Sequence, residues 1–166
     1  MYIDTHSVIV EATPEHTWDV VSHLGGDPRL WTPGPLWRTR GALERLVGGP
    51  GHRIEGPGRA LAVGDTMDFW RVLEVRPPTR LRVQAESLLP GEAFLDVIVA
   101  PQGSRPGTSL HHRLTAQTKL TLRTEFEPAG LVGHAFWWSE LGAHKVVFAL
   151  MARRLAALVT TAHPAP

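Results

Sequence analysis

The tail of the chain carries its longest series of apolar residues at helical spacing. Read at 3.6 residues per turn, one stripe contains Leu131, Ala135, Trp138, Leu141, Phe148, Ala152, Leu155 and Val159. A second set widens this stripe and consists of Phe136, Trp137, Val147, Leu150 and Met151. A helix over about 130–160 would be about 45 Å long, and it can be buried only if something curved wraps around it. The pattern therefore predicts a long, wrapped C-terminal helix.

The part of the chain before this helix alternates between apolar and polar residues, as strands with one buried face do. The strand-like segments are 66–75, 80–86, 93–99 and 108–126. In the first, the more apolar set is Met67, Phe69, Arg71, Leu73 and Val75, so it is expected to face the interior and to carry Arg71 with it. In the last, the inner set is Leu110, His112, Leu114, Ala116, Thr118, Leu120, Leu122 and Phe126. A strand of that length must bend or bulge, which allows one slip of register.

The first part of the chain predicts a strand followed by two short helices. Residues 2–12 alternate without a clear inner face, as an edge strand does. Thr13 and Pro14 begin a helix that is expected to bury Trp18, and residues 36–47 form a second amphipathic helix. The complete order predicts a single α+β domain over 1–166, in which a curved antiparallel sheet grips the long C-terminal helix.

Composition narrows the class of protein. The net charge of +1 gives no general attraction for nucleic acid or for an anionic membrane surface. The absence of cysteine excludes disulfides, zinc–thiolate sites and cysteine nucleophiles. We see neither a signal peptide nor an apolar run long enough for a transmembrane helix, so a cytoplasmic location is expected. Six tryptophans against one tyrosine supply large indoles that can shape a cavity.

Several short phrases are similar to those of a known family. They are Leu36-Trp37-Arg38, Arg45-Leu46-Val47-Gly48-Gly49, Gly64-Asp65, Asp68-Phe69-Trp70-Arg71-Val72, Gln117-Thr118, Gly130-Leu131, Trp137-Trp138 and Met151-Ala152-Arg153. Together with the order of elements, they resemble the START and birch-pollen-allergen-like superfamily, abbreviated SRPBCC, whose members have the helix-grip fold. More narrowly, they look like a branch of unknown function that occurs alone or fused behind short-chain-dehydrogenase-like domains. The resemblance extends from about residue 30 to the end.

The resemblance implies a deep, mostly apolar cavity between the sheet and the long helix, closed at one end by the two short helices. Members of the superfamily bind lipids, sterols, polyketides or plant hormones, and a minority are cyclases, aromatases or hydrolases of such ligands. This sequence lacks the signature phrases of the co-chaperone branch. It also lacks the cysteine and histidine pair that holds an iron–sulfur centre in ring-hydroxylating oxygenases. A small hydrophobic molecule is the expected partner, and no cofactor is expected.

Arg71 is the charged residue whose predicted position raises the sharpest question. A guanidinium on an inner face must be paired or wetted, because burial of an isolated charge costs several kcal/mol. One interpretation is an anchor for a carboxylate, phenolate or enolate. The other is an internal ion pair, for instance with Glu140, or a strand face assigned wrongly.

The tryptophans allow both packing and ligand-contact interpretations. Trp70, Trp137 and Trp138 can pack in the core or line the cavity, and adjacent indoles on a helix point about 100° apart, so at least one of the 137–138 pair is expected to reach the cavity. Trp31 and Trp37 are candidates for its mouth or for a partner surface. The complete predicted ligand-binding set is Phe69, Arg71, His112, Leu114, Thr118, Trp138, Leu141, Trp37 and Trp31.

Catalytic candidates are Arg71 and the histidines that would share the interior with it. His112 lies on the apolar face of its strand, and Glu140 and His144 stand four residues apart on the predicted helix. A histidine beside a carboxylate can act as a general acid or base, whereas a lone histidine on an apolar face is more often a core residue. No HxH or HExxH spacing predicts a metal site, and no Gly-x-Ser-x-Gly elbow predicts a hydrolase.

Three functions follow as expectations. The first is binding of a small hydrophobic or amphipathic molecule in the interior. The second is a cyclase- or isomerase-like enzyme in which Arg71 stabilises an enolate and His112 or His144 moves a proton. The third is an interaction module or homodimer, which exposure of Phe136, Trp137, Val147 and Met151 would favour and their burial would oppose.

Overall fold

A computed structural model describes residues 1–25, 57–102 and 117–162 of the chain. In this part, a six-stranded antiparallel sheet has the order β1-β6-β5-β4-β3-β2. The strands are β1 (Tyr2–Val10), β2 (Thr66–Met67), β3 (Trp70–Arg76), β4 (Arg80–Ala85), β5 (Gly91–Pro101) and β6 (Thr118–Pro128). The helices are α1 (Pro14–Ser22) and α4 (Gly130–Ala162). This is the predicted helix-grip architecture, and the predicted helix over 36–47 lies outside the described residues.

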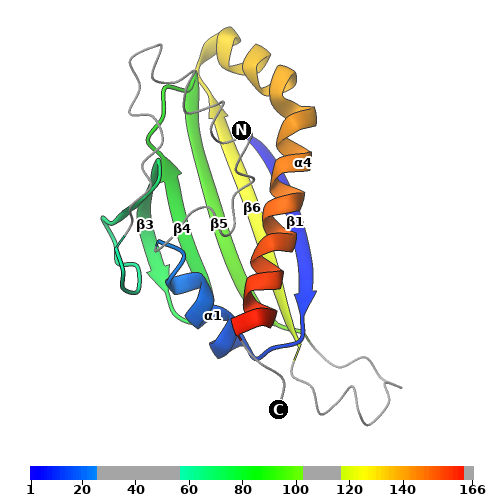
Figure 1. Cartoon of the computed structure of the whole chain (residues 1–166). Helices are drawn as coiled ribbons and strands as arrows, with labels where there is room; N and C mark the ends of the chain where they lie inside the picture. The colour runs from blue at the N-terminus through cyan, green and yellow to red at the C-terminus, as the bar shows by residue number, and fades with distance from the viewer. Residues whose placement is uncertain (26–56, 103–116, 163–166) are drawn as a thin grey trace.

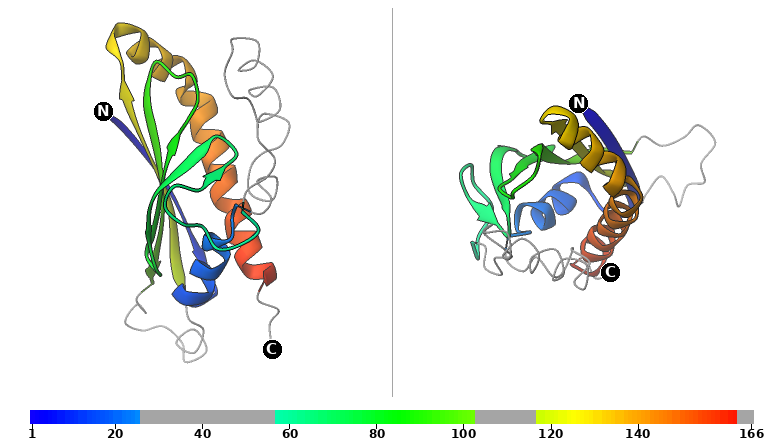
Figure 2. Two further views of the ribbon diagram at one scale, coloured as in Figure 1. Left: turned by 90° about the vertical axis from the view of Figure 1, so that its left-hand side faces the viewer. Right: turned by 90° about the horizontal axis from the view of Figure 1, so that it is seen from above.

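The two helices cover different parts of one face of the sheet, which we call the inner face. The sheet is curved, and α4 lies along one side of its concave face while α1 sits at one end (Figures 1 and 2). Helix α4 packs chiefly on β1 and β6, and α1 packs on β5, β6 and α4. Among the described elements, neither helix therefore packs extensively on β3 and β4.

Helix α1 begins as its sequence predicts. The Thr13 hydroxyl accepts a hydrogen bond from the backbone N–H of His16 at 3.1 Å, and Pro14 occupies the first turn, where its missing N–H is not needed. Trp18, Val21 and Leu24 are buried. The helix therefore closes one end of the core with its apolar side.

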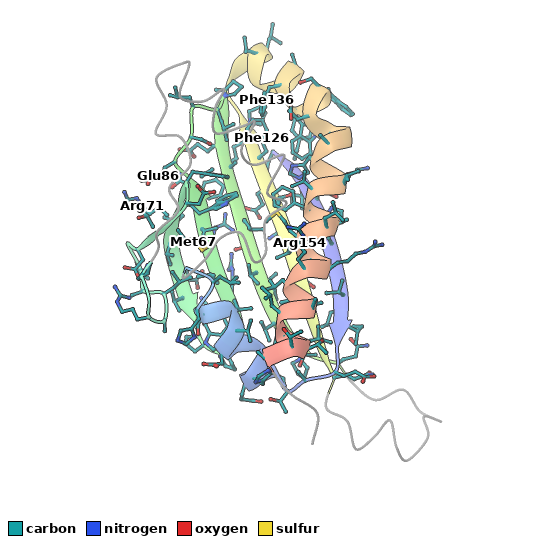
Figure 3. The ribbon with its side chains drawn as sticks, viewed as in Figure 1. Met67, Arg71, Glu86, Phe126, Phe136 and Arg154 are labelled. Carbon is teal, nitrogen blue, oxygen red and sulfur yellow. The ribbon has the colours of Figure 1, made fainter. Side chains whose placement is uncertain are left out.

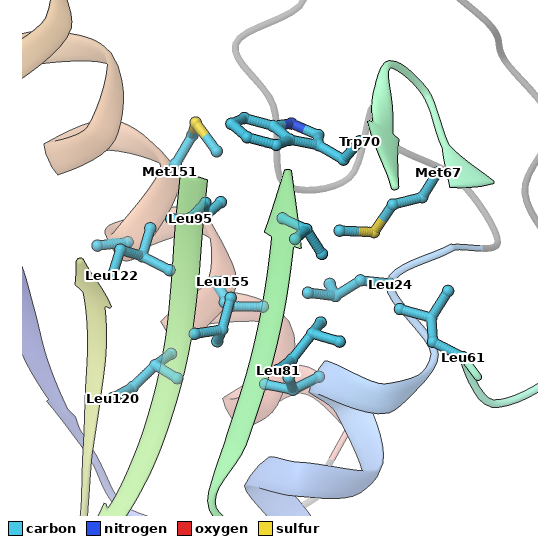
Figure 4. Packing of buried hydrophobic residues seen from close by; sticks show 14 of the residues in the cluster. Leu24, Leu61, Met67, Trp70, Leu81, Leu95, Leu120, Leu122, Met151 and Leu155 are labelled. Atoms are coloured by element: carbon cyan, nitrogen blue, oxygen red, sulfur yellow. The ribbon is translucent and has the colours of Figure 1, made fainter. Parts of the chain in front are cut away.

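The main core lies between the inner face and the C-terminal half of α4. Figure 4 shows leucines from β4, β5, β6 and α4, with Leu24 from the segment after α1 and Leu61 from the segment before β2, converging there with Met67, Met151 and Trp70. The predicted inner sets of 80–86 and of 118–126 are confirmed, because Leu81, Val83, Leu120 and Leu122 are fully buried. Alternation therefore assigned the faces of β4 and β6 correctly.

The predicted stripe on α4 is correct only in its C-terminal half. The buried side of this helix consists of Gly133, Trp137, Val147, Phe148, Met151, Ala152, Leu155 and Val159. Leu131 and Trp138 are exposed, and Trp137 turns inward instead. The reason lies at Gly133: a Cβ there would overlap Pro90 O and lie 2.8 Å from Pro128 Cα. At this point the helix approaches the sheet through a glycine. A pattern of large apolar residues does not reveal such a contact.

Helix α4 has 33 residues, but its composition does not suit a bilayer. Among the described helices, none combines the length and the apolar character that crossing a membrane requires.

Candidate functional site

Two alanines interrupt the large side chains of the inner face. Trp70 pairs with Ala85 across β3 and β4, and Tyr2 pairs with Phe126, which pairs with Ala93 across β6 and β5. Because Gln84 pairs with Phe94, the antiparallel register places Ala85 beside Ala93. We call Tyr2, Phe126, Ala93, Ala85 and Trp70 the alanine row. Ala93 and Ala85 are half-buried, and their side chains extend only one carbon from the backbone. The next row along these strands contains the larger, fully buried Leu95 and Val83.

Aromatic rings stand at the β1–β6 end of the alanine row. Trp137 of α4 stacks on Tyr2 with 5.0 Å between ring centroids and on Phe126 with 5.8 Å. Phe136 is half-buried, with its ring centroid 5.8 Å from that of Phe126, and Figure 3 shows these two side chains together between the sheet and the first turns of α4. The small central side chains of the row are thus bordered by large aromatic ones.

A polar group of side chains, which we call the Asp4 cluster, lies next to this row. It consists of Asp4 and His6 of β1, Thr124 of β6 and His144 of α4. Asp4 Oδ2 accepts a hydrogen bond from His6 Nε2 at 2.9 Å and lies 3.8 Å from His144 Nε2. The side chains of Asp4, His6 and His144 retain 18%, 19% and 18% of their accessible surface. The cluster is therefore partly buried but still accessible.

The contacts of Thr124 orient the His144 ring. The Thr124 hydroxyl lies 3.4 Å from the carbonyl oxygen of Asp4, which can only accept, and 3.0 Å from His144 Nε2. When Nε2 carries the proton, His144 donates to the Thr124 hydroxyl, which in turn donates to Asp4 O. The imidazole also lies between the rings of Trp137 and Phe148, with centroid distances of 5.1 and 4.4 Å. Such a fixed imidazole can hold a proton at a defined place.

The expected inward position of Arg71 is wrong. Its side chain is 46% exposed, and its Nε donates to Glu86 Oε1, not to Glu140. The cause is a bulge in β3: the register with β4 shifts between Val72 and Glu74, so the residues before it change face relative to simple alternation. Trp70 and Val72 face inward in place of Arg71 and Leu73. Figure 3 shows Arg71 and Glu86 at the β3 side of the sheet.

Two other predicted site residues on α4 point away from the interior. Trp138 is 64% exposed, because the buried side of the helix is set by Gly133 and Trp137. Glu140 is also exposed, and the carboxylate beside His144 is that of Asp4 instead. The predicted pairing of Glu140 with His144 is therefore replaced by a contact between α4 and β1.

The remaining described candidates lie inside the fold. Phe69 is buried beside Trp70, with 4.9 Å between ring centroids, and Leu141 is half-buried. Thr118 is buried and donates its hydroxyl proton to Ala12 O at 2.7 Å, which joins β6 to the segment after β1. The other candidates lie outside the described residues, namely His112, Leu114, Trp31 and Trp37.

Sequence reasoning missed Asp4, His6 and Thr124. Asp4 and His6 lie on the same face of β1 as Val8 and Val10. Thr124 lies on the same face of β6 as Leu120 and Leu122. The signal was therefore present in the alternation. It was obscured because an edge strand that alternates polar and apolar residues on both faces shows no clear inner side.

The opposite, outer face carries a charge network instead of a site. Asp96 accepts hydrogen bonds from Arg80 at 3.0 Å and from Arg82 at 2.9 Å. Arg82 also donates to Glu125 at 2.6 Å, and this hydrogen bond lowers the pKa of the Glu125 carboxyl below its usual range. Each acid in the network has a basic partner, so we assign it a structural role.

The described residues hold no evident metal centre. Within 1–25, 57–102 and 117–162, no three or more His, Asp or Glu side chains gather in a way that could hold a metal ion.

Solved structures with the same fold include proteins that handle small molecules. Norcoclaurine synthase from Thalictrum flavum, in a complex with dopamine and hydroxybenzaldehyde, is 16% identical, with a TM-score of 0.58 over 99% of this chain and 89% of that one. A protein from Thermobifida fusca is also 16% identical, with a TM-score of 0.58 over 97% and 95%. The di-domain ARO/CYC BexL from the BE-7585A biosynthetic pathway is 18% identical, with a TM-score of 0.55 over 96% of this chain and 48% of that one. These likenesses confirm the helix-grip fold.

The sequence itself gives a narrower relationship. No curated protein matches the chain. One family profile, described as a protein of unknown function (DUF2867), matches residues 1–151, which is far more than half of the chain. The chain therefore belongs to the DUF2867 family.

Proposed function

We propose that this protein binds a small hydrophobic or amphipathic molecule on the inner face of the sheet, over the alanine row and beside α4. The observation that supports this most directly is the pair of half-buried alanines between the aromatic side chains of Phe126 and Trp70. Ligand sites are mostly apolar concave surfaces with a few convergent polar groups. The Asp4 cluster supplies such groups at one end of the row.

The fold supports this proposal in a general way. The solved complex of norcoclaurine synthase contains two small aromatic molecules, dopamine and hydroxybenzaldehyde. A helix-grip protein can thus hold ligands of that size. For this chain, the ligand contacts we propose are made by Ala85, Ala93, Phe126 and Phe136, in place of Arg71 and Trp138. Contacts by His112, Leu114, Trp31 and Trp37 stay predictions.

The test has two stages. Native mass spectrometry of the purified protein, followed by extraction, shows whether a stoichiometric small molecule is bound and identifies its class. The fluorescent probe anilinonaphthalene sulfonate then serves for displacement measurements with wild type and Ala93→Leu. The longer side chain would project over the row and compete with a bound molecule, so we expect probe binding to weaken about tenfold. The matched control is Ala157→Leu on the exposed side of α4.

The outcomes separate clearly. Weakened binding in Ala93→Leu, with normal binding in Ala157→Leu and equal circular dichroism spectra, supports the site. A protein that carries no small molecule and does not bind the probe would refute the proposal. Binding that is identical in wild type and Ala93→Leu would place the site elsewhere.

A cyclase- or isomerase-like activity is a second candidate function, and the geometry of His144 favours it. Its imidazole is oriented by Thr124 and approached by the carboxylate of Asp4, so it can exchange a proton with a bound molecule. Deuterium exchange next to the carbonyl of a bound ketone tests this. We expect His144→Gln to slow the exchange without weakening binding, and equal rates in both proteins would rule out this role.

The interaction module is the least supported of the three candidates. Trp137, Val147 and Met151 are buried and Phe136 is half-buried, which counts against the strip proposed for a partner. A homodimer through other parts of α4 stays a prediction, which sedimentation equilibrium would test.

A further inference from the structure

The indole of Trp70 has an unmet hydrogen-bond donor. Its side chain is 4% exposed, and Nε1 is the one buried side-chain nitrogen or oxygen in the described part of the chain that has no hydrogen-bond partner. Trp70 forms one end of the alanine row. The unmet donor therefore belongs to the same surface as the proposed ligand site.

The cost of this arrangement calls for an explanation. A buried donor without an acceptor loses its hydrogen bonds to water without replacement, and buried tryptophans usually find a partner for the indole N–H. A phenylalanine would cover the core here without that cost. Natural structures contain few such orphaned groups, and each of them calls for an explanation.

Among the described residues around the indole, none accepts a hydrogen bond from Nε1. Figure 4 shows the indole between Met151 and Met67 at the border of the aliphatic core, with its nitrogen on the edge turned away from Leu95 and Leu155. Phe69 packs beside it. A buried water molecule needs two to four polar partners, which these apolar neighbours do not provide. An acceptor that is part of a larger apolar molecule fits this environment better.

We propose that Trp70 Nε1–H is the donor that recognises the ligand, and that the ligand therefore carries a carbonyl or hydroxyl oxygen, so that it is not a plain hydrocarbon. This inference rests on the proposed ligand site and adds the chemical class to it. The oxygen sits at the β3 end of the alanine row, and the apolar body extends over Ala85 and Ala93 towards Phe126. Trp70 and Phe126 lie three strand spacings apart, about 14 Å along the sheet, which sets the length of a molecule that contacts both.

Fluorenone and fluorene are suitable probes, because they have nearly the same shape and differ by a carbonyl oxygen. Their ability to displace anilinonaphthalene sulfonate is compared in wild type, Trp70→Phe and Trp18→Phe. The Trp18 variant is the matched control, since Trp18 is also buried but belongs to α1. A hydrogen bond of about 1.4 kcal/mol corresponds to a tenfold change in affinity. We expect wild type and Trp18→Phe to prefer fluorenone about tenfold, and Trp70→Phe to lose this preference while binding fluorene normally.

A second measurement uses the wild-type protein and does not depend on the folding of any variant. The assigned Nε1–H signal of Trp70 in a ¹H–¹⁵N spectrum is followed during titration with each probe. Fluorenone should move this proton signal downfield, as formation of a hydrogen bond does, and fluorene should not.

Failure of the inference and failure of the proposed site give different results. A preference for fluorenone that persists in Trp70→Phe, no preference in wild type, or an Nε1–H signal that responds alike to both probes would overturn the role of Trp70 and leave the binding site in place. If neither probe displaces the dye and the purified protein holds no small molecule, the site itself is refuted, and this inference with it.

Discussion

His144 Nε2 lies 3.0 Å from the hydroxyl oxygen of Thr124, and this contact joins α4 to β6 inside the Asp4 cluster. It orients the one histidine of α4 that approaches a carboxylate of the sheet. The contact thus links the stability of the fold to the chemistry of the candidate site.

Thr124→Val should test this link. The substitution keeps the shape of the side chain but removes the hydroxyl that lies 3.0 Å from His144 Nε2, so we expect the free energy of unfolding to fall by about 1 kcal/mol. Urea denaturation measures this change. The control is Thr121→Val on the outer face of the same strand, where the hydroxyl meets Ser7 at an exposed position and the expected change is within about 0.5 kcal/mol. Equal losses in both variants would contradict the special role of the Thr124 contact.

The outer charge network predicts acid sensitivity. The hydrogen bond from Arg82 lowers the pKa of Glu125 in the folded protein, so the ionised form stabilises the fold. This stabilisation is fully present above the ordinary glutamate pKa of about 4.3 and is lost as the pH falls through the lower, folded value. Glu125→Gln should therefore be less stable than wild type at pH 7, and the difference should shrink at pH 3. Urea denaturation at both values measures it, with Glu127→Gln as the exposed control on the same strand. A difference that grows at low pH would contradict this assignment.

Two glycines of α4 should respond in opposite directions to alanine. At Gly133 the new Cβ would overlap Pro90 O and approach Pro128, both backbone atoms that cannot turn aside. At Gly142 the Cβ meets no atom within 4 Å, and alanine favours the helix by about 1 kcal/mol. We expect thermal denaturation to show a lower Tm for Gly133→Ala and a higher one for Gly142→Ala. A stabilised Gly133→Ala protein would show that α4 does not approach the sheet so closely.

The phase of α4 can be tested with two leucines. Leu155 is fully buried, so Leu155→Ala should lower the free energy of unfolding by about 2–5 kcal/mol. Leu131 is 87% exposed, and Leu131→Ala should change it by no more than about 0.5 kcal/mol. Chemical denaturation distinguishes this phase from the stripe that sequence periodicity predicts, in which both leucines would be costly to remove.

Alternation and helical periodicity sufficed to predict the architecture. Leu81, Val83, Leu120 and Leu122 show their inner position in the sequence because burial selects one face of a regular strand. The C-terminal half of α4 shows its buried side for the same reason. Each of these elements is regular, so the spacing of its apolar residues shows which face is buried.

The candidate site depends on an irregular strand and on contacts between different elements. The bulge in β3 places Arg71 outward and Trp70 inward. No residue type in that strand predicts the bulge. Asp4 and His144 approach each other because β1 and α4 pack together. They are far apart in the sequence, so no sequence pattern predicts that they form a pair. Ala85 and Ala93 are recognised as neighbours only from the register of β4 and β5. Contacts between elements, unlike faces within them, require the three-dimensional structure.

The pairing of β1 with β6 has a consequence for synthesis of the chain. Asp4 and Thr124 face each other across 120 residues of sequence. At about 5–20 residues per second, the ribosome needs roughly 6–24 s to produce the partner of β1. During that time the first strand has no ladder to join, and its isoleucines and valines stay open to other chains. The edge strand that is made first is therefore among the last to find its partner in the sheet.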